Sequence, residues 1–180
     1  FQRGDCARWL LTDNGGGLIG RIAAFYEKKS DNTGLWAGGC GFFECIDDQE
    51  AANRLFDTAR AWLSERGVEA MDGPINFGNR ERWWGVLVDG FHPPCYCCNY
   101  NPPYYYKLFE QYGFEIYFKQ FTYRREIATP LSSKVGEKAF HALQDAGYTF
   151  GHIDRNQLAK AAEDFRTVYN EAWAPHEGVN

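Results

Sequence analysis

The sequence has 180 residues, enough for one ordinary domain or for one domain with part of another. Hydrophobic residues make up 44% and charged residues 24%, as in a globular protein. No apolar run approaches the ~20 residues that cross a membrane, and a net charge of −5 without a Lys/Arg cluster argues against nucleic-acid binding. We therefore expect a small-molecule ligand as the partner.

The first third of the chain predicts an antiparallel meander. Residues 7–12 and 18–26 have strand composition, and the Asp-Asn-Gly-Gly-Gly run between them suits a hairpin turn. A third strand is expected over roughly 35–46. Its glycines (Gly38, Gly39 and Gly41) predict a bulge or the close approach of another segment.

The period of apolar residues then changes to that of a helix. The predicted buried face is made of Ala51, Ala52, Leu55, Phe56, Ala59, Trp62 and Leu63. Asp47 and Glu50 have the spacing of a capping box, and Gly67 suits the end of the helix. A short strand is expected over 68–75.

A long polar loop is predicted over 73–101, rich in Gly, Pro and Asn. Pro102 and Pro103 then suit the start of a helix, with Asn101 as a possible cap and Gly113 as its end. The buried stripe of this helix is expected to contain Tyr105, Leu108, Phe109 and Tyr112. Aromatic and β-branched residues over 115–127 predict another strand.

Beyond Thr129 the expected elements are a helix near 134–145, a strand over 148–153 and an amphipathic helix. The apolar side of that last helix runs from Leu158 to Trp173 and needs a partner to bury it.

The order of these elements, and the run LFEQYGF at 108–114, resembles the GNAT superfamily of acyl-CoA N-acyltransferases. The segments GPINFGNRERWWGVLVDGF (73–91) and NPPYYYKLFEQYGF (101–114) are similar to a group of bacterial GNAT-like proteins. The resemblance covers about residues 6–125. It implies an α/β (α+β) fold, with a mixed, mostly antiparallel sheet flanked by helices.

The resemblance also implies acyl-CoA as cofactor, and acetyl-CoA is the simplest case. In GNAT enzymes a Gly-rich, Arg/Gln-led turn before the first long helix holds the pyrophosphate. Here the turn reads Cys-Ile-Asp-Asp-Gln-Glu at 45–50, so three carboxylates stand where a polyanion is expected. We expect acyl-CoA binding to be weakened, displaced or lost.

A tyrosine of the late helix often serves as the general acid in that superfamily. The alignment on Tyr-Gly-Phe puts Phe109 at that position, and Phe109 carries no transferable proton. Tyr105 is therefore the candidate catalytic residue, with Tyr106 and Tyr112 as alternatives if one of them faces the cleft. Strand amides near 71–75 are expected to stabilise the oxyanion.

A GNAT fold begins with a strand and helices ahead of the meander, and none precedes Phe1. We therefore expect residues 1–128 to form a GNAT-like core without those elements. Residues 129–180 then form a linker helix and the opening of a second unit, within a longer protein. Alternatively, the C-terminal strand and helix complete the first unit, within one chain or by swapping in a homodimer.

The loop after the predicted fourth strand offers the candidate substrate-binding residues. Amides suit polar anchoring, guanidinium groups suit a carboxylate or phosphate, and indoles suit the wall of a cleft. The candidates are Asn76, Asn79, Arg80, Trp84 and Tyr104. Equally, this could be a structural loop whose polar residues satisfy turns and whose aromatic residues are buried.

The positions of the cysteines predict their redox state and bear on metal binding. The cysteines show no regular disulfide framework, so reduced thiols in a cytoplasmic protein are the simplest interpretation. His92 lies close to three of them in sequence, but the spacing is too cramped for an ordinary zinc site, so no metal is predicted. The six are Cys6, Cys40, Cys45, Cys95, Cys97 and Cys98.

The expected function is that of a GNAT-type acyltransferase, which moves an acyl group from acyl-CoA to an amine acceptor. The alternative is a ligand-binding or structural module of the same fold with a degenerate acyl-CoA site.

Overall fold

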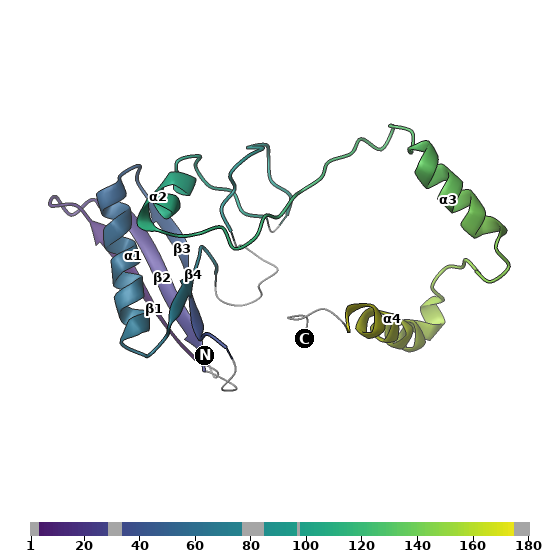
Figure 1. The fold of residues 1–180 in the computed structure, drawn as a ribbon, viewed down its shortest axis with the longest axis horizontal. Coiled ribbons are helices and arrows are strands. Elements are labelled where there is room, and N and C mark those ends of the chain that lie inside the picture. Colours follow the sequence, from purple (N-terminus) through teal and green to yellow (C-terminus); the bar gives the residue numbers. More distant parts are fainter. Residues whose placement is uncertain (1–3, 29–33, 77–84, 97, 175–180) are drawn as a thin grey trace. The chain divides into compact units, whose positions relative to one another are not determined.

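The computed structural model describes residues 4–28, 34–76, 85–96 and 98–174 (Figure 1). Its contacts divide the chain into two compact units, Phe1–Gln120 and Phe121–Asn180, and each is described by itself. The first unit is an α+β fold built on a four-stranded mixed sheet, as the sequence predicts.

The sheet has the strand order β1 (Gly4–Thr12), β2 (Leu18–Glu27), β3 (Ala37–Cys45) and β4 (Ala70–Asp72). The first three strands pair antiparallel, which confirms the predicted meander. β4 pairs parallel with β3 because a helix carries the chain back between them. The predicted strand 68–75 is thus cut to three residues, followed by Pro74, which has no N–H for a ladder.

Helix α1 (Gln49–Ser64) packs its apolar face against the sheet (Figure 1). Its cap is Asp48, whose Oδ1 accepts the N–H of Ala51 at 2.8 Å. The expectation of a capping box at Asp47 is therefore wrong by one residue. Beyond the helix, Gly67 has φ +79°, a conformation that glycine adopts without strain.

The core lies between α1, one face of the sheet and α2 (Tyr105–Tyr112). Phe43 stacks on Phe56 with ring centroids 4.8 Å apart and an interplanar angle of 8°. Phe109 meets both rings edge-on, at 5.0 and 4.8 Å. The position that the GNAT alignment assigns to an acid is thus held by a buried hydrocarbon ring, 4% exposed.

Strand β3 has a bulge that the glycines of its sequence predict. Its register against β2 shifts between Arg21 and Ala23, and Phe42 has φ +48°. A Cβ atom on Gly41 would lie 1.9 Å from the carbonyl oxygen of Ile75. Both predicted features, the bulge and the close approach of another segment, are therefore present.

Helix α2 begins at Tyr105, later than its prolines predict, and ends at Gly113 with φ +108°. Asn101 is not its cap. The Oδ1 atom of Asn101 accepts the N–H of Leu87 at 2.7 Å, and its Nδ2 donates to the Leu87 carbonyl at 3.2 Å. The same Nδ2 also donates to the Pro102 carbonyl at 2.9 Å, and the residue at the N-cap position of α2 is Tyr104, so that expectation is wrong.

The predicted strand over 115–127 is also wrong. Residues 115–127 form no strand, and their large apolar side chains are exposed. Strand composition alone does not supply the neighbouring backbone that a ladder needs.

The second unit contains α3 (Ser133–Gln144), the short 3₁₀ helix η1 (Arg155–Gln157) and α4 (Leu158–Trp173). The two predicted helices are confirmed, but residues 148–153 form no strand. Neither α3 nor α4 has a buried residue. Among the described helices of both units, none has the length and apolar character to cross a membrane.

Candidate functional site

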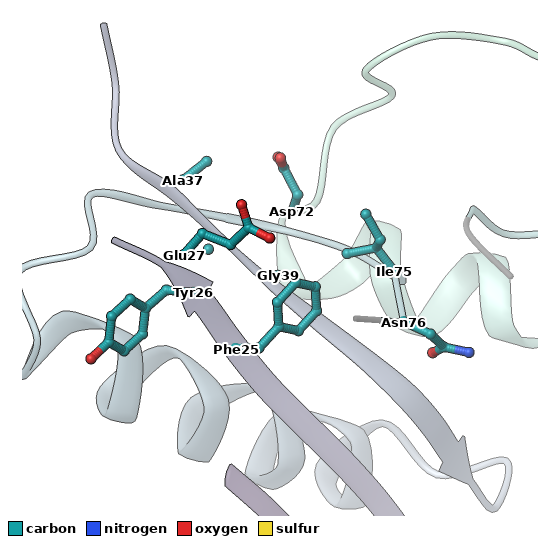
Figure 2. A pocket seen from close by; sticks show the side chains of 9 residues that line it. Phe25, Tyr26, Glu27, Ala37, Gly39, Asp72, Ile75 and Asn76 are labelled. Carbon is teal, nitrogen blue, oxygen red and sulfur yellow. The ribbon is translucent and has the colours of Figure 1, made fainter. Parts of the chain in front are cut away.

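A cavity of about 340 Å³ opens on the sheet of the first unit. We call it the sheet cavity. Its size is near the lower end for small-molecule sites. Figure 2 shows that its side chains come from the ends of β2 and β4, the start of β3 and the segment after β4. The lining residues are Phe25, Tyr26, Glu27, Ala37, Gly38, Gly39, Asp72, Ile75 and Asn76.

The strand register explains the make-up of the sheet cavity. Gly39 of β3 pairs with Phe25 on one side and with Asp72 on the other. Directly paired residues share a face of a sheet, so these three lie in one row. Gly39 has no side chain to fill the centre, and the ring of Phe25 and the side chain of Ile75 lie within 3 Å of the position a Cβ would take there. The part of the lining around Gly39 is therefore apolar.

Two carboxylates, Glu27 and Asp72, complete the described lining, and no cationic side chain is among these described residues. Figure 2 shows both acidic side chains on the same side of the sheet as the ring of Phe25. The end of β2 is fixed because Trp36 Nε1 donates to the Glu27 carbonyl at 2.9 Å. Asp72 also lies near the buried thiol of Cys40, whose pKa is raised to about 12 by burial first and by the negative charge of Asp72 second.

Asn76, a predicted substrate anchor, lines the sheet cavity and also has a structural contact. Its Oδ1 atom accepts the N–H of Phe42, the residue at the bulge, at 2.7 Å. This bond ties the segment after β4 to β3 and fixes the orientation of the amide. The other predicted loop residues, Asn79, Arg80 and Trp84, lie outside the described residues.

Tyr104 and Tyr105 do not line the sheet cavity; both bond to the backbone of Cys45, where β3 ends. The Tyr105 hydroxyl accepts the Cys45 N–H at 3.1 Å, and the Tyr104 hydroxyl donates to the Cys45 carbonyl at 2.8 Å. We call this arrangement the tyrosine clamp. Burial is the main cause that raises the pKa of both tyrosines, so both hydroxyls are protonated at neutral pH.

The alternative tyrosines also have hydroxyl partners elsewhere. Tyr106 donates to Glu110 and Tyr112 donates to Asp57, each at 2.8 Å. Burial and the bond to Asp57 raise the pKa of Tyr112 to about 12. The described lining of the sheet cavity thus includes none of the three candidate acids. One of the backbone amides predicted to stabilise an oxyanion is already bonded within the sheet: the Ile75 N–H donates to the Cys40 carbonyl at 2.7 Å.

The turn before α1 does not fit the pyrophosphate of acyl-CoA. Asp48 already accepts the N–H of Ala51, and its carboxylate adds negative charge beside Asp47. Glu50 forms an ion pair with Arg54 at 2.6 Å, which engages the cation nearest to this turn in sequence. The helix N-terminus is therefore capped from within the chain, and a polyanion there would meet carboxylates.

The cysteines and His92 form no gathered site among the described residues. Cys40 and Cys45 are buried, and burial first and Asp48 second raise the pKa of Cys45 to about 11. Cys95 is exposed, and Cys97 lies outside the described residues. Within the described part of the chain, no three side chains of His, Cys, Asp or Glu are placed to hold a metal ion.

Sequence reasoning missed Glu27 and Asp72. Each ends a strand next to polar or turn residues, which is an unremarkable position for a carboxylate. Only the pairing of β3 with both β2 and β4 brings the two strand ends to one cavity. The sequence did contain one sign of this cavity, namely the three glycines of β3, because they mark the part of the sheet that other segments approach.

No family model matches the chain, and no solved structure matches it. Protein YghO of Escherichia coli (strain K12) is 26% identical to it over 166 residues, which is 91% of this chain and 42% of that protein. The bacterial ceramide synthase of Caulobacter vibrioides (strain NA1000 / CB15N) is 26% identical over 172 residues, 94% of this chain and 44% of that protein. The chain thus spans less than half the length of these two relatives.

Proposed function

We propose that the chain is part of an acyltransferase of GNAT-like type that joins an acyl group to the nitrogen of an amine. The observation that carries the proposal is the similarity, over 94% of the chain, to a protein named bacterial ceramide synthase. A ceramide is a long-chain amino alcohol with a fatty acyl group on its nitrogen, so that name describes the formation of an amide bond. The order of meander, helix, strand and helix in the first unit agrees with the resemblance.

Acyl-CoA is the donor that the resemblance implies. We propose that its pyrophosphate is not held at the turn before α1, because the Asp48 cap and the neighbouring carboxylates occupy that position. The tyrosine clamp holds the backbone just before this turn, since both the N–H and the carbonyl of Cys45 are bonded. The cytoplasmic location and a homodimer with swapped C-terminal segments stay predictions.

The second candidate is a ligand-binding or structural module with a degenerate acyl-CoA site. Two observations favour it: the acidic turn before α1, and the buried ring of Phe109 at the position of the usual acid. Such a module would bind a small molecule in the sheet cavity without transferring a group to it.

The two candidates differ in a product that can be measured. The protein is incubated with palmitoyl-CoA and a long-chain amine, and the N-acyl amide is sought by mass spectrometry, with heat-denatured protein as the control. We expect enzyme-dependent amide formation. Calorimetry with acetyl-CoA and palmitoyl-CoA provides a separate measure of donor binding. Absence of amide together with absence of donor binding would favour the binding module.

A further inference from the structure

The sheet cavity combines three features that together select a ligand. Part of its lining is apolar, since the ring of Phe25 and the side chain of Ile75 both lie within 3 Å of the position that a Cβ on Gly39 would take. Among the residues that the structure describes, its lining includes the carboxylates of Glu27 and Asp72 and no cationic side chain. Its volume of about 340 Å³ suits the head of a molecule rather than a whole lipid.

The two carboxylates are available to a ligand. Both residues are exposed, and no ion pair or side-chain hydrogen bond joins either of them to another described residue. Other exposed acids of the same unit are paired, such as Glu44 with Arg21 at 2.8 Å and Glu50 with Arg54. Two carboxylates without an ion-pair partner in the described part of the chain, beside an aromatic ring, attract a cation and disfavour an anion such as a phosphate or a carboxylate.

The backbone around the cavity holds its walls in place. Asp72 is fixed by the pairing of β4 with β3, and Glu27 by the bond from Trp36 to its carbonyl. Asn76 is held by the N–H of Phe42. A ligand would therefore meet a site whose main-chain positions are already set, which lowers the cost of binding.

We propose that the sheet cavity binds the ammonium head of an amphipathic primary amine, with Glu27 and Asp72 contacting the charge and Phe25 and Ile75 contacting the adjoining methylene groups. A primary ammonium has three N–H donors, so it can bond more than one carboxylate oxygen. The inference deepens the proposed function, since it assigns a place on this chain to the amine acceptor. It concerns binding only and adds no reacting group.

The test measures octylamine binding by calorimetry, with 1-octanol as the uncharged comparison. Octylamine should bind more tightly than 1-octanol, and high salt should weaken it. The double variant Glu27→Gln/Asp72→Asn should bind octylamine about tenfold more weakly or worse, because each neutral amide replaces a charge-assisted contact. Glu44→Gln is the matched control, as it removes a carboxylate from the same sheet outside the cavity, and its affinity should match that of the unaltered chain.

Thermal unfolding of each variant checks that the exposed substitutions leave the fold intact. Equal octylamine affinity in the double variant, or equal loss in Glu44→Gln, would overturn the proposal. So would octanol binding as tight as that of octylamine.

Amide formation from octylamine and palmitoyl-CoA, measured in the same samples, separates this inference from the proposed function. Octylamine binding with neither amide formation nor binding of palmitoyl-CoA would overturn the acyltransferase and leave the amine site standing. Amide formed at an unchanged rate by the double variant would overturn the amine site and leave the acyltransferase standing.

Discussion

Hydroxyl groups at the start of α2 have structural partners that the sequence does not reveal. Tyr105 accepts the Cys45 N–H, and Tyr104 donates to the carbonyl of the same residue. A buried N–H without a partner costs free energy, so the Tyr105 hydroxyl stabilises the fold whether or not it also takes part in chemistry. The structural role accounts for its burial at 8% exposure.

Replacing Tyr105 with Phe should lower the free energy of unfolding by about 1–3 kcal/mol, because the Cys45 N–H loses its acceptor. Tyr106→Phe is the control, since its hydroxyl bonds an exposed Glu110, and its effect should stay below about 0.5 kcal/mol. Urea denaturation followed by circular dichroism gives both values. An unfolding free energy unchanged in Tyr105→Phe would contradict the clamp, whereas a loss of activity in the folded variant beyond that of Tyr104→Phe would support a catalytic Tyr105.

Tyr112 gives a pH dependence whose sign follows from its pKa. The folded pKa is raised from 10.0 to about 12, by burial first and by the bond to Asp57 second. The stabilisation from Tyr112 is therefore fully present below pH 10 and is lost as the pH rises through about 12. Between these values the unfolding free energy of Tyr112→Phe should fall less steeply than that of the unaltered chain. Parallel curves in denaturant titrations across this range would contradict the assignment.

At the scale of elements, the spacing of hydrophobic residues predicts those helices and strands whose formation depends on their own sequence. The three strands of the meander, α1, α2 and the last two helices follow from it, because each buries or presents an apolar stripe of its own. The strands expected at 115–127 and 148–153 are absent, because a ladder needs a second backbone that composition does not provide. The partner of Asn101 lies fourteen residues away at Leu87, so it too is not readable from local spacing.

The N-terminus of α1 provides a test at the element scale. Asp48→Ala should lower the unfolding free energy by about 1 kcal/mol, because the N–H of Ala51 loses its acceptor. Asp47→Ala, one residue earlier, should change it by less than about 0.5 kcal/mol. Thermal and urea unfolding of the pair compare two aspartates of equal charge at adjacent positions. A larger loss in Asp47→Ala would restore the capping box that the sequence suggests.

The candidate site could be predicted only in part, because some of its residues come together through contacts between segments that are distant in the sequence. Asn76 lines the sheet cavity as a loop amide should, and the glycines of β3 mark the approach of its segment. Glu27 and Asp72 are far apart in sequence and meet only through the registers of two strand pairs. Local spacing therefore suggests that a cleft exists near β3 but not which charges line it.

At the scale of the whole molecule, the helices of the two units differ in how many of their side chains are buried. Helix α1 buries Leu55, Phe56 and Leu63, whereas α3 and α4 bury no residue. Helices without packing contacts are marginal in water, since their stability comes mainly from an apolar face pressed against a partner. The second unit thus has little of its own to resist opening.

Hydrogen exchange of the isolated chain should therefore separate the units. We expect the amides in the middle of α1 to exchange slowly, near the limit of global unfolding, and those of α3 and α4 to exchange within the first time points. Mass spectrometry after proteolytic digestion resolves the three helices. Slow exchange in α4, with its exposed Phe165 and Trp173, would mean that this face is covered in solution and would contradict the expectation.

The tyrosine clamp also bears on the order in which the chain assembles. Its two bonds span 59 and 60 positions along the chain, whereas α1 starts only four residues after Cys45. During translation, the residues of the meander and of α1 are all synthesised before either tyrosine. The N–H and the carbonyl of Cys45 therefore gain these partners only after the start of α2 has emerged, and we expect the clamp to form late in co-translational folding.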